Sequence, residues 1–96
     1  MNIIQKRREK RKEIINRITK GLKNSIKEYG KYGLPFSFES AIIAVQANFY
    51  CARRTAIEYL DIALYNAELT RSNLPLKNRG FLMNLVIPES KNRVSK

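Results

Sequence analysis

The chain is organised around one segment, Phe49-Tyr50-Cys51-Ala52-Arg53-Arg54-Thr55-Ala56-Ile57-Glu58-Tyr59-Leu60. A short break falls at Tyr50-Cys51, and the helix expected after it opens with two adjacent arginines. In a DNA-reading helix, the N-terminal residues meet base edges while later apolar residues hold the helix to its domain. We therefore interpret this stretch as the turn and second helix of a helix-turn-helix.

Apolar residues on both sides of the break recur at the three- and four-residue spacing of one helix face. They predict one helix over about 38–49 and another over about 52–66. Ser37 is a suitable N-cap for the first of these helices. The expected inward-facing residues are Phe38, Ala41, Ile42, Val45 and Phe49 in the first helix and Ala56, Tyr59, Leu60, Ala63 and Leu64 in the second.

A third helix is expected in the N-terminal part of the chain. Good helix formers dominate from Gln5 to Tyr29, and Gly30, Gly33 and Pro35 then end the helix. The apolar stripe of its second half packs either on the chain's own core or on the same helix of a second copy. Because two-fold symmetry suits palindromic DNA sites, we expect a homodimer. The predicted interface consists of Ile14, Ile18, Leu22 and Ile26.

The C-terminal part of the chain predicts a small β component. Leu69-Thr70-Arg71 is expected to form a short strand, turn residues fill the segment from Ser72 to Gly80, and Phe81 to Ile87 is expected to form a second strand. The fold class expected is mainly α (α+β): a three-helix winged helix-turn-helix with a C-terminal two-stranded β-hairpin wing and an extended basic N-terminal helix. The predicted parts are a basic arm at 1–13, the winged domain at 14–88 and a polar tail at 89–96.

Between about Phe38 and Ile87 the sequence resembles small archaeal winged helix-turn-helix proteins, of the kind carried by crenarchaeal viruses and plasmids. The matching residues are Cys51-Ala52-Arg53-Arg54-Thr55-Ala56, then Tyr59-Leu60, and then Leu64, Ala67 and Leu69. The resemblance implies sequence-specific binding of duplex DNA, commonly by a dimer that regulates transcription. The chain departs from the usual pattern at Tyr50 and at Ala67-Glu68, where glycine is common, and at Gln46, where a small alanine is common.

The charge of the chain favours a polyanionic partner. Nineteen Lys and Arg against eight Asp and Glu give a net charge of +11 and a pI near 10.2. Eleven of those cations fall within residues 1–31. A small basic protein of this kind binds DNA, RNA or an anionic membrane surface. We expect double-stranded DNA, with non-specific architectural binding through the basic N-terminal helix as the alternative; a peripheral membrane role ranks last.

Three groups of residues are candidates for contacting DNA. Arginine pairs with guanine or clamps phosphate, an isoleucine can pack on a thymine methyl, and a glutamate accepts from cytosine. For each residue a plain surface or capping role is the alternative. The candidates are Ala52, Arg53, Arg54, Thr55, Ile57 and Glu58 in the recognition helix, Arg71, Lys77 and Arg79 in the wing, and Lys6, Arg7, Arg8, Lys10, Arg11 and Lys12 in the arm.

Catalysis finds little support in the residue types present. The chain has no histidine and a single cysteine, Cys51, and its acidic residues are scattered. It has neither a glycine-rich phosphate loop nor the Cys/His spacing of a zinc site. We therefore expect no enzymatic activity, no cofactor and no metal. The lone thiol, the lack of a secretory pattern and the lack of a long apolar run favour a cytoplasmic protein without a membrane span.

Overall fold

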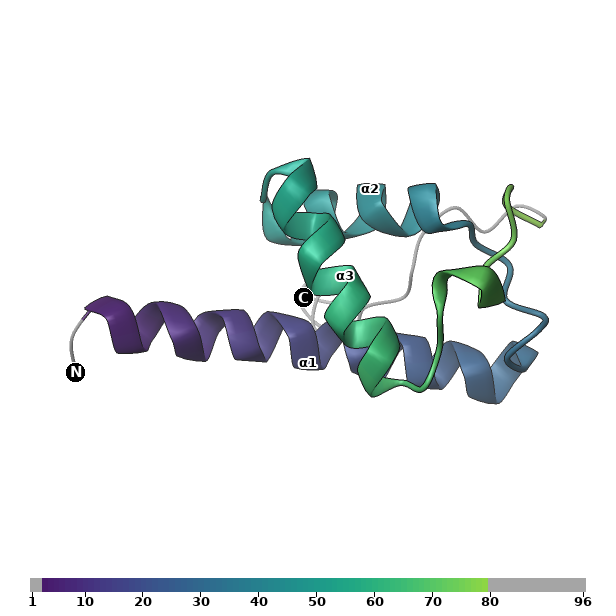
Figure 1. Cartoon of the computed structure of the whole chain (residues 1–96), viewed down its shortest axis with the longest axis horizontal. Helices are drawn as coiled ribbons and strands as arrows, with labels where there is room; N and C mark the ends of the chain where they lie inside the picture. The colour runs from purple at the N-terminus through teal and green to yellow at the C-terminus, as the bar shows by residue number, and fades with distance from the viewer. Residues whose placement is uncertain (1–2, 80–96) are drawn as a thin grey trace, which may run out of the picture.

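The computed structural model describes residues 3–79 as three α-helices and one short 3-10 helix. These elements are α1 (Ile3–Tyr29), α2 (Phe38–Phe49), α3 (Arg53–Asn66) and η1 (Arg71–Asn73). Figure 1 shows α1 and α2 along opposite sides of the molecule, with α3 crossing between them. The N-terminal half of α1 extends well beyond the other elements. It is one continuous helix that passes without a break through the arm boundary expected at residue 13.

The β component of the sequence-based fold prediction is wrong. Residues 3–79 contain no strand, and the segment expected to form the first wing strand continues from the end of α3 into η1. Thr70 and Asn73 explain this outcome, because the side-chain oxygen of Asn73 accepts a hydrogen bond from the Thr70 amide at 2.9 Å. Such local side-chain bonds favour a turn over extended backbone. The second expected strand, Phe81 to Ile87, lies outside the described residues.

Local signals in the sequence set the ends of the helices. Gly30 follows α1 with a left-handed φ of +84° and donates its amide to the Ile26 carbonyl at 2.7 Å. Gly33 then passes so close to the helix end that an added Cβ would lie 2.3 Å from the carbonyl oxygen of Tyr29. Ser37 caps α2, its hydroxyl accepting from the Ser40 amide at 3.1 Å. The loop between α1 and α2 is therefore short and closely packed.

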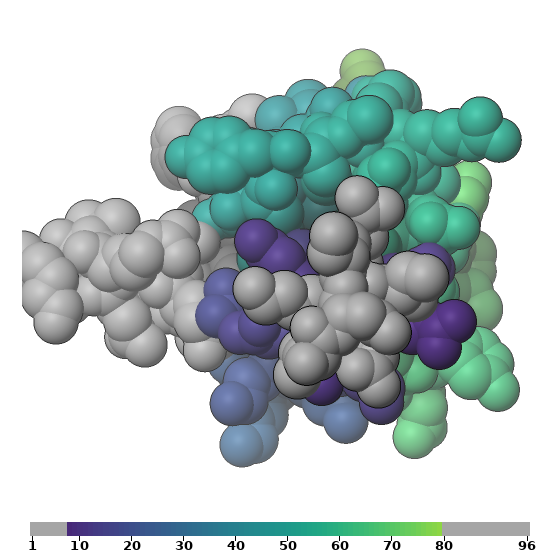
Figure 2. Space-filling view, turned by 90° about the vertical axis from the view of Figure 1, so that its left-hand side faces the viewer, coloured from purple at the N-terminus to yellow at the C-terminus, as the bar shows by residue number. Residues whose placement is uncertain are grey.

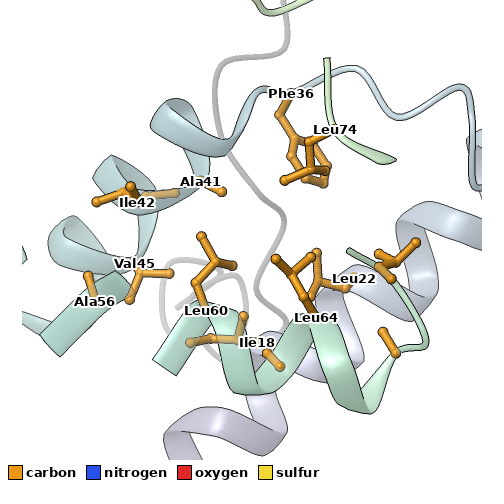
Figure 3. Packing of buried hydrophobic residues seen from close by; sticks show 14 of the residues in the cluster. Ile18, Leu22, Phe36, Ala41, Ile42, Val45, Ala56, Leu60, Leu64 and Leu74 are labelled. Carbon is orange, nitrogen blue, oxygen red and sulfur yellow. The ribbon is translucent and has the colours of Figure 1, made fainter. Parts of the chain in front are cut away.

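The core lies where the three helices meet, and α3 is its centre. In Figure 3, Ile18 and Leu22 of α1 point toward Leu60 and Leu64 of α3. All four side chains are fully or almost fully buried. Burying one such side chain contributes about 1.5–3 kcal/mol relative to leaving it in water. The other labelled members of the cluster are Phe36, Ala41, Ile42, Val45, Ala56 and Leu74.

Candidate nucleic-acid interface

Three residues, Tyr50, Cys51 and Ala52, connect α2 to α3. Tyr50 adopts the left-handed conformation (φ 52°, ψ 52°), and its amide donates to the Gln46 carbonyl at 2.8 Å. The Gln46 side chain in turn donates to the Cys51 carbonyl at 3.5 Å. Glycine is the usual residue in this conformation because it has no Cβ. Tyr50 thus fills a structural position that suits glycine, and Gln46 braces the turn.

The first turn of α3 is open to solvent. Ala52 occupies the N-cap position and offers no side-chain hydrogen bond to the helix. The amides of Arg53, Arg54 and Thr55 precede the first intrahelical bond, which joins the Ala56 amide to the Ala52 carbonyl at 2.9 Å. Unpaired amides and the helix dipole together favour an anion at a helix N-terminus. This end of α3 therefore suits a phosphate.

The exposed face of α3 differs in part from the expected set. Ala52, Arg53, Arg54 and Glu58 are exposed, whereas Thr55 and Ile57 are half-buried. Ile57 packs against the core cluster, so only part of its side chain is accessible to a thymine methyl. The outward ridge continues through two residues that were not candidates, Asp61 and Tyr65. Asp61 lies three residues after Glu58, and Tyr65 lies four residues after Asp61, so the helical spacing was the available signal.

Arg53 is held by an acidic residue on α2. Its guanidinium donates to both carboxylate oxygens of Glu39, at 2.6 and 2.7 Å. These hydrogen bonds are the main reason that the pKa of Glu39 lies below its ordinary value and that the pKa of Arg53 is raised. Both side chains are exposed. Because a phosphate presents the same paired oxygens as a carboxylate, it can replace Glu39 on this guanidinium.

Two further arginines reach α3 from outside the helix-turn-helix. From α1, Arg11 lies 3.5 Å from the Glu58 carboxylate and 5.8 Å from the centre of the Tyr59 ring. From η1, Arg71 donates to both oxygens of Asp61, at 3.0 and 2.7 Å, and these bonds are the main cause of its raised pKa.

The Arg71 guanidinium also lies 4.3 Å from the ring centre of Phe38, at the start of α2. One candidate from the arm, Arg11, and one expected in the wing, Arg71, therefore flank α3. Among the candidate arginines of residues 3–79 whose side chains are described, Arg8 and Arg54 have side chains that take part in no ion pair or hydrogen bond.

The remaining residues assigned to a wing do not form a hairpin tip within residues 3–79. The Arg79 amide donates to the Pro35 carbonyl at 2.7 Å, and its guanidinium donates to the Tyr32 carbonyl at 3.0 Å. The Asn78 side chain accepts from the Ser37 amide at 2.9 Å. This segment is thus tied to the loop between α1 and α2. Lys77 is exposed beside it.

The arm and the expected dimer stripe both lie on α1. Arg8, Lys10, Arg11 and Lys12 are exposed; Lys6 and Arg7 belong to the helix, and only their backbone is described. Within the stripe, Ile18 and Leu22 are 0% exposed, while Ile14 and Ile26 are half-buried against the same core. The stripe therefore packs on the chain's own core. In this packing Ile18 and Leu22 present no surface to a partner, whereas Ile14 and Ile26 remain partly exposed.

A shallow groove separates the arm from the turn. Its volume is about 370 Å³, and it is lined by Lys10, Arg11, Ile14, Phe49, Cys51 and Tyr59. Cys51 is half-buried there, and burial raises the pKa of its thiol, which favours the protonated form.

No protein-family model, curated protein or solved structure matches this chain. Its function is therefore inferred from its own geometry. Across residues 3–79, none of the helices combines the length and apolar character needed to cross a membrane. The same residues hold no group of three or more His, Cys, Asp or Glu side chains that could bind a metal ion.

Proposed function

We propose that this protein binds double-stranded DNA in a sequence-specific manner and regulates transcription, with the N-terminal half of α3 in the major groove. The observation that carries the proposal is the α2–turn–α3 geometry. A left-handed turn at Tyr50 leads into a recognition helix whose first turn is uncapped, exposed and opened by Arg53 and Arg54. The inner face of that helix is fixed in the core by Ala56, Leu60 and Leu64.

Arg54 is the residue assigned to base reading. It is exposed, and no carboxylate within residues 3–79 engages it, so its guanidinium can pair bidentately with O6 and N7 of guanine. Arg53 is assigned to phosphate, because DNA has only to replace the exposed Glu39 carboxylate. Glu58 is a weaker candidate for cytosine, since Arg11 already occupies one of its oxygens.

The basic half of α1 supplies contacts to the DNA backbone. Arg11 lies beside the recognition helix, where it pairs with Glu58 at 3.5 Å. The exposed cations Arg8, Lys10 and Lys12 extend this positive surface along the projecting end of the helix (Figure 1). Phosphate contacts position a protein on DNA without reading sequence, and each contributes about 0.9 to the slope of log affinity against log salt. The arm therefore raises affinity, and α3 supplies the discrimination.

A second candidate function has its own support. Glu58 and Asp61 place two negative charges on the outer face of α3, where they balance Arg53 and Arg54. Residues 8–12 carry four cations and one acid. Binding governed by charge alone would thus favour the arm over α3. In that case the protein is a non-specific architectural module, and the helix-turn-helix has only a structural role.

One experiment separates the two functions. Random duplex DNA is selected on the purified protein at about 0.15 M salt, which suppresses purely electrostatic binding. The selection is repeated with Arg54→Gln and with Lys12→Gln, a matched variant that removes one exposed charge from the arm. We expect an enriched motif that Arg54→Gln relaxes at one position and Lys12→Gln preserves. Two half-sites about one helical turn apart would support a homodimer. Selection without any enriched motif would contradict the proposal.

A further inference from the structure

A second basic surface lies on α1, in its C-terminal half, and Lys12 of the arm lines one hollow with its first two lysines. Lys20, Lys23 and Lys27 are all exposed, and their spacing of three and four residues aligns them along one face of the helix. We name this surface the lysine ridge. At 3.6 residues per turn, its members lie roughly 140–200° around the helix from Ile18. They span seven residues, which corresponds to about 10 Å along the axis.

The lysine ridge points away from α3. Ile18 and Leu22 occupy the opposite face of α1, and both are fully buried in the core that α1 shares with α3. Figure 2 looks at the molecule from the N-terminal side of α1. In this view α2 and α3 form the upper part, whereas blue side chains from the later part of α1 project from the lower edge. A duplex bound to the first turn of α3 leaves the ridge accessible.

The ridge lysines differ from the arginines beside α3 in having no acidic partner. Within residues 3–79, each of Arg11, Arg53 and Arg71 pairs with a carboxylate, while no ion pair or hydrogen bond joins Lys20, Lys23 or Lys27 to another side chain. Like charges three and four residues apart on a helix destabilise it slightly. No packing interaction offsets this cost, because all three side chains are exposed. A bound polyanion would offset it.

The surroundings of the ridge indicate which polyanion fits. Asn16 and Asn24 flank the lysines and are also exposed, so the surface is polar without an aromatic platform for unstacked bases. The apolar face of α1 is buried under α3 and cannot enter a bilayer, which argues against a membrane. Each strand of a duplex places a phosphate about every 3.4 Å along the helix axis, so a ridge about 10 Å long can contact more than one phosphate.

We propose that the lysine ridge binds the phosphate backbone of a second DNA duplex, so that one molecule bridges two duplexes. The proposal rests on the proposed function for the first duplex, which α3 and the arm hold. The ridge contact reads no sequence, because it consists of ammonium groups on phosphates. Bridging would let a molecule bound at its specific site recruit a distant segment of DNA.

The test uses the full-length chain and a charge-matched pair of triple variants. One is K20Q/K23Q/K27Q, which removes the ridge. The other is R8Q/K10Q/R11Q, which removes the same charge from the arm of the same helix and leaves Lys12, beside the ridge, in place. Lys, Arg and Gln have similar helix propensities, so both variants should fold. Circular dichroism checks this, and sedimentation at the assay concentration gives the oligomeric state.

Two readouts are taken on each protein. Fluorescence anisotropy with a limiting labelled duplex that carries the selected motif measures binding at α3. Beads bearing that duplex, saturated with protein and washed, then measure capture of a second fluorescent duplex without the motif. We expect the ridge variant to reduce capture at least fivefold with the motif affinity within about twofold of wild type. The arm variant should lose motif affinity but retain most of its capture at saturation.

Several results would overturn bridging. Undiminished capture of the second duplex by the ridge variant would refute bridging. An equal loss of capture in both variants would also refute it, because the effect would then follow total charge. If the wild-type protein binds the motif but captures no second duplex, bridging alone is refuted. If the wild-type protein does not bind the motif, the proposed function is refuted. A competition experiment compares polyglutamate with unlabelled duplex at equal concentrations of negative charge. If polyglutamate displaces the second duplex at the lower concentration, the ridge binds an acidic protein and not DNA.

Discussion

Replacing Tyr50 by glycine should stabilise this protein, because Tyr50 holds a backbone conformation that suits glycine better. Its φ of 52° and ψ of 52° lie in the left-handed region, where a side chain costs about 1–2 kcal/mol. Glycine avoids that cost but loses about 0.5–1 kcal/mol more chain entropy on folding than alanine. The ring is 90% exposed, so little apolar burial is lost. The expected net stabilisation is about 0.5–1 kcal/mol.

Thermal and urea unfolding of wild type, Tyr50→Gly and Tyr50→Ala measure this effect. In a domain of this size, the expected gain raises Tm by about 2–8 °C. Tyr50→Ala is the matched control, since it removes the ring and keeps the Cβ, and it should stay within about 0.5 kcal/mol of wild type. If the glycine variant is no more stable than the alanine variant, the turn is not left-handed. The geometry that carries the proposed function would then be wrong.

Three further predictions concern the α1–α2 loop, the core and the Arg53–Glu39 pair. Gly33→Ala should destabilise the protein by roughly 1–3 kcal/mol in urea unfolding, because its Cβ would meet the backbone oxygen of Tyr29; a change under about 0.5 kcal/mol would contradict this close approach. Leu22→Ala should cost about 2–5 kcal/mol. Its unfolding midpoint should not vary with protein concentration, whereas a concentration-dependent midpoint would return Leu22 to a dimer interface. Arg53→Gln should raise the pKa of Glu39 toward its ordinary 4.5, as followed by NMR titration. Because the folded-state pKa lies below the unfolded one, the pair stabilises the fold above about pH 4.5 and this contribution fades as pH falls; an unchanged pKa in the variant would refute the pairing.

Local chemistry determined the helices and the turn from the sequence alone. The apolar periodicity and the cap at Ser37 predicted α2 with its observed bounds, and the break at Tyr50-Cys51 located the connection to α3. These signals act within a few residues of one another, so they can be recognised without knowing the fold. The exposure of Arg53, Arg54 and Glu58 followed from the same periodicity.

The β-hairpin prediction failed because a short apolar run has no intrinsic preference strong enough to specify a strand. Leu69 is apolar, yet its amide donates to the Leu64 carbonyl at 2.8 Å and closes the end of α3. Glu68 enables this closure by adopting a φ of 61°, which is uncommon for a residue other than glycine. The competition between capping a helix and beginning a strand is decided by packing, and the sequence pattern does not report it.

Residue order alone thus predicts three helices, the turn and a positive charge concentrated at the N-terminal end. Helix packing in three dimensions establishes what the apolar stripe of α1 contacts and which acids engage Arg11, Arg53 and Arg71. Those pairs join residues 10 to 47 positions apart, and no local signal encodes them. They form because helix packing brings α1, α2 and η1 alongside α3. The same packing turned Lys20, Lys23 and Lys27 to the opposite side.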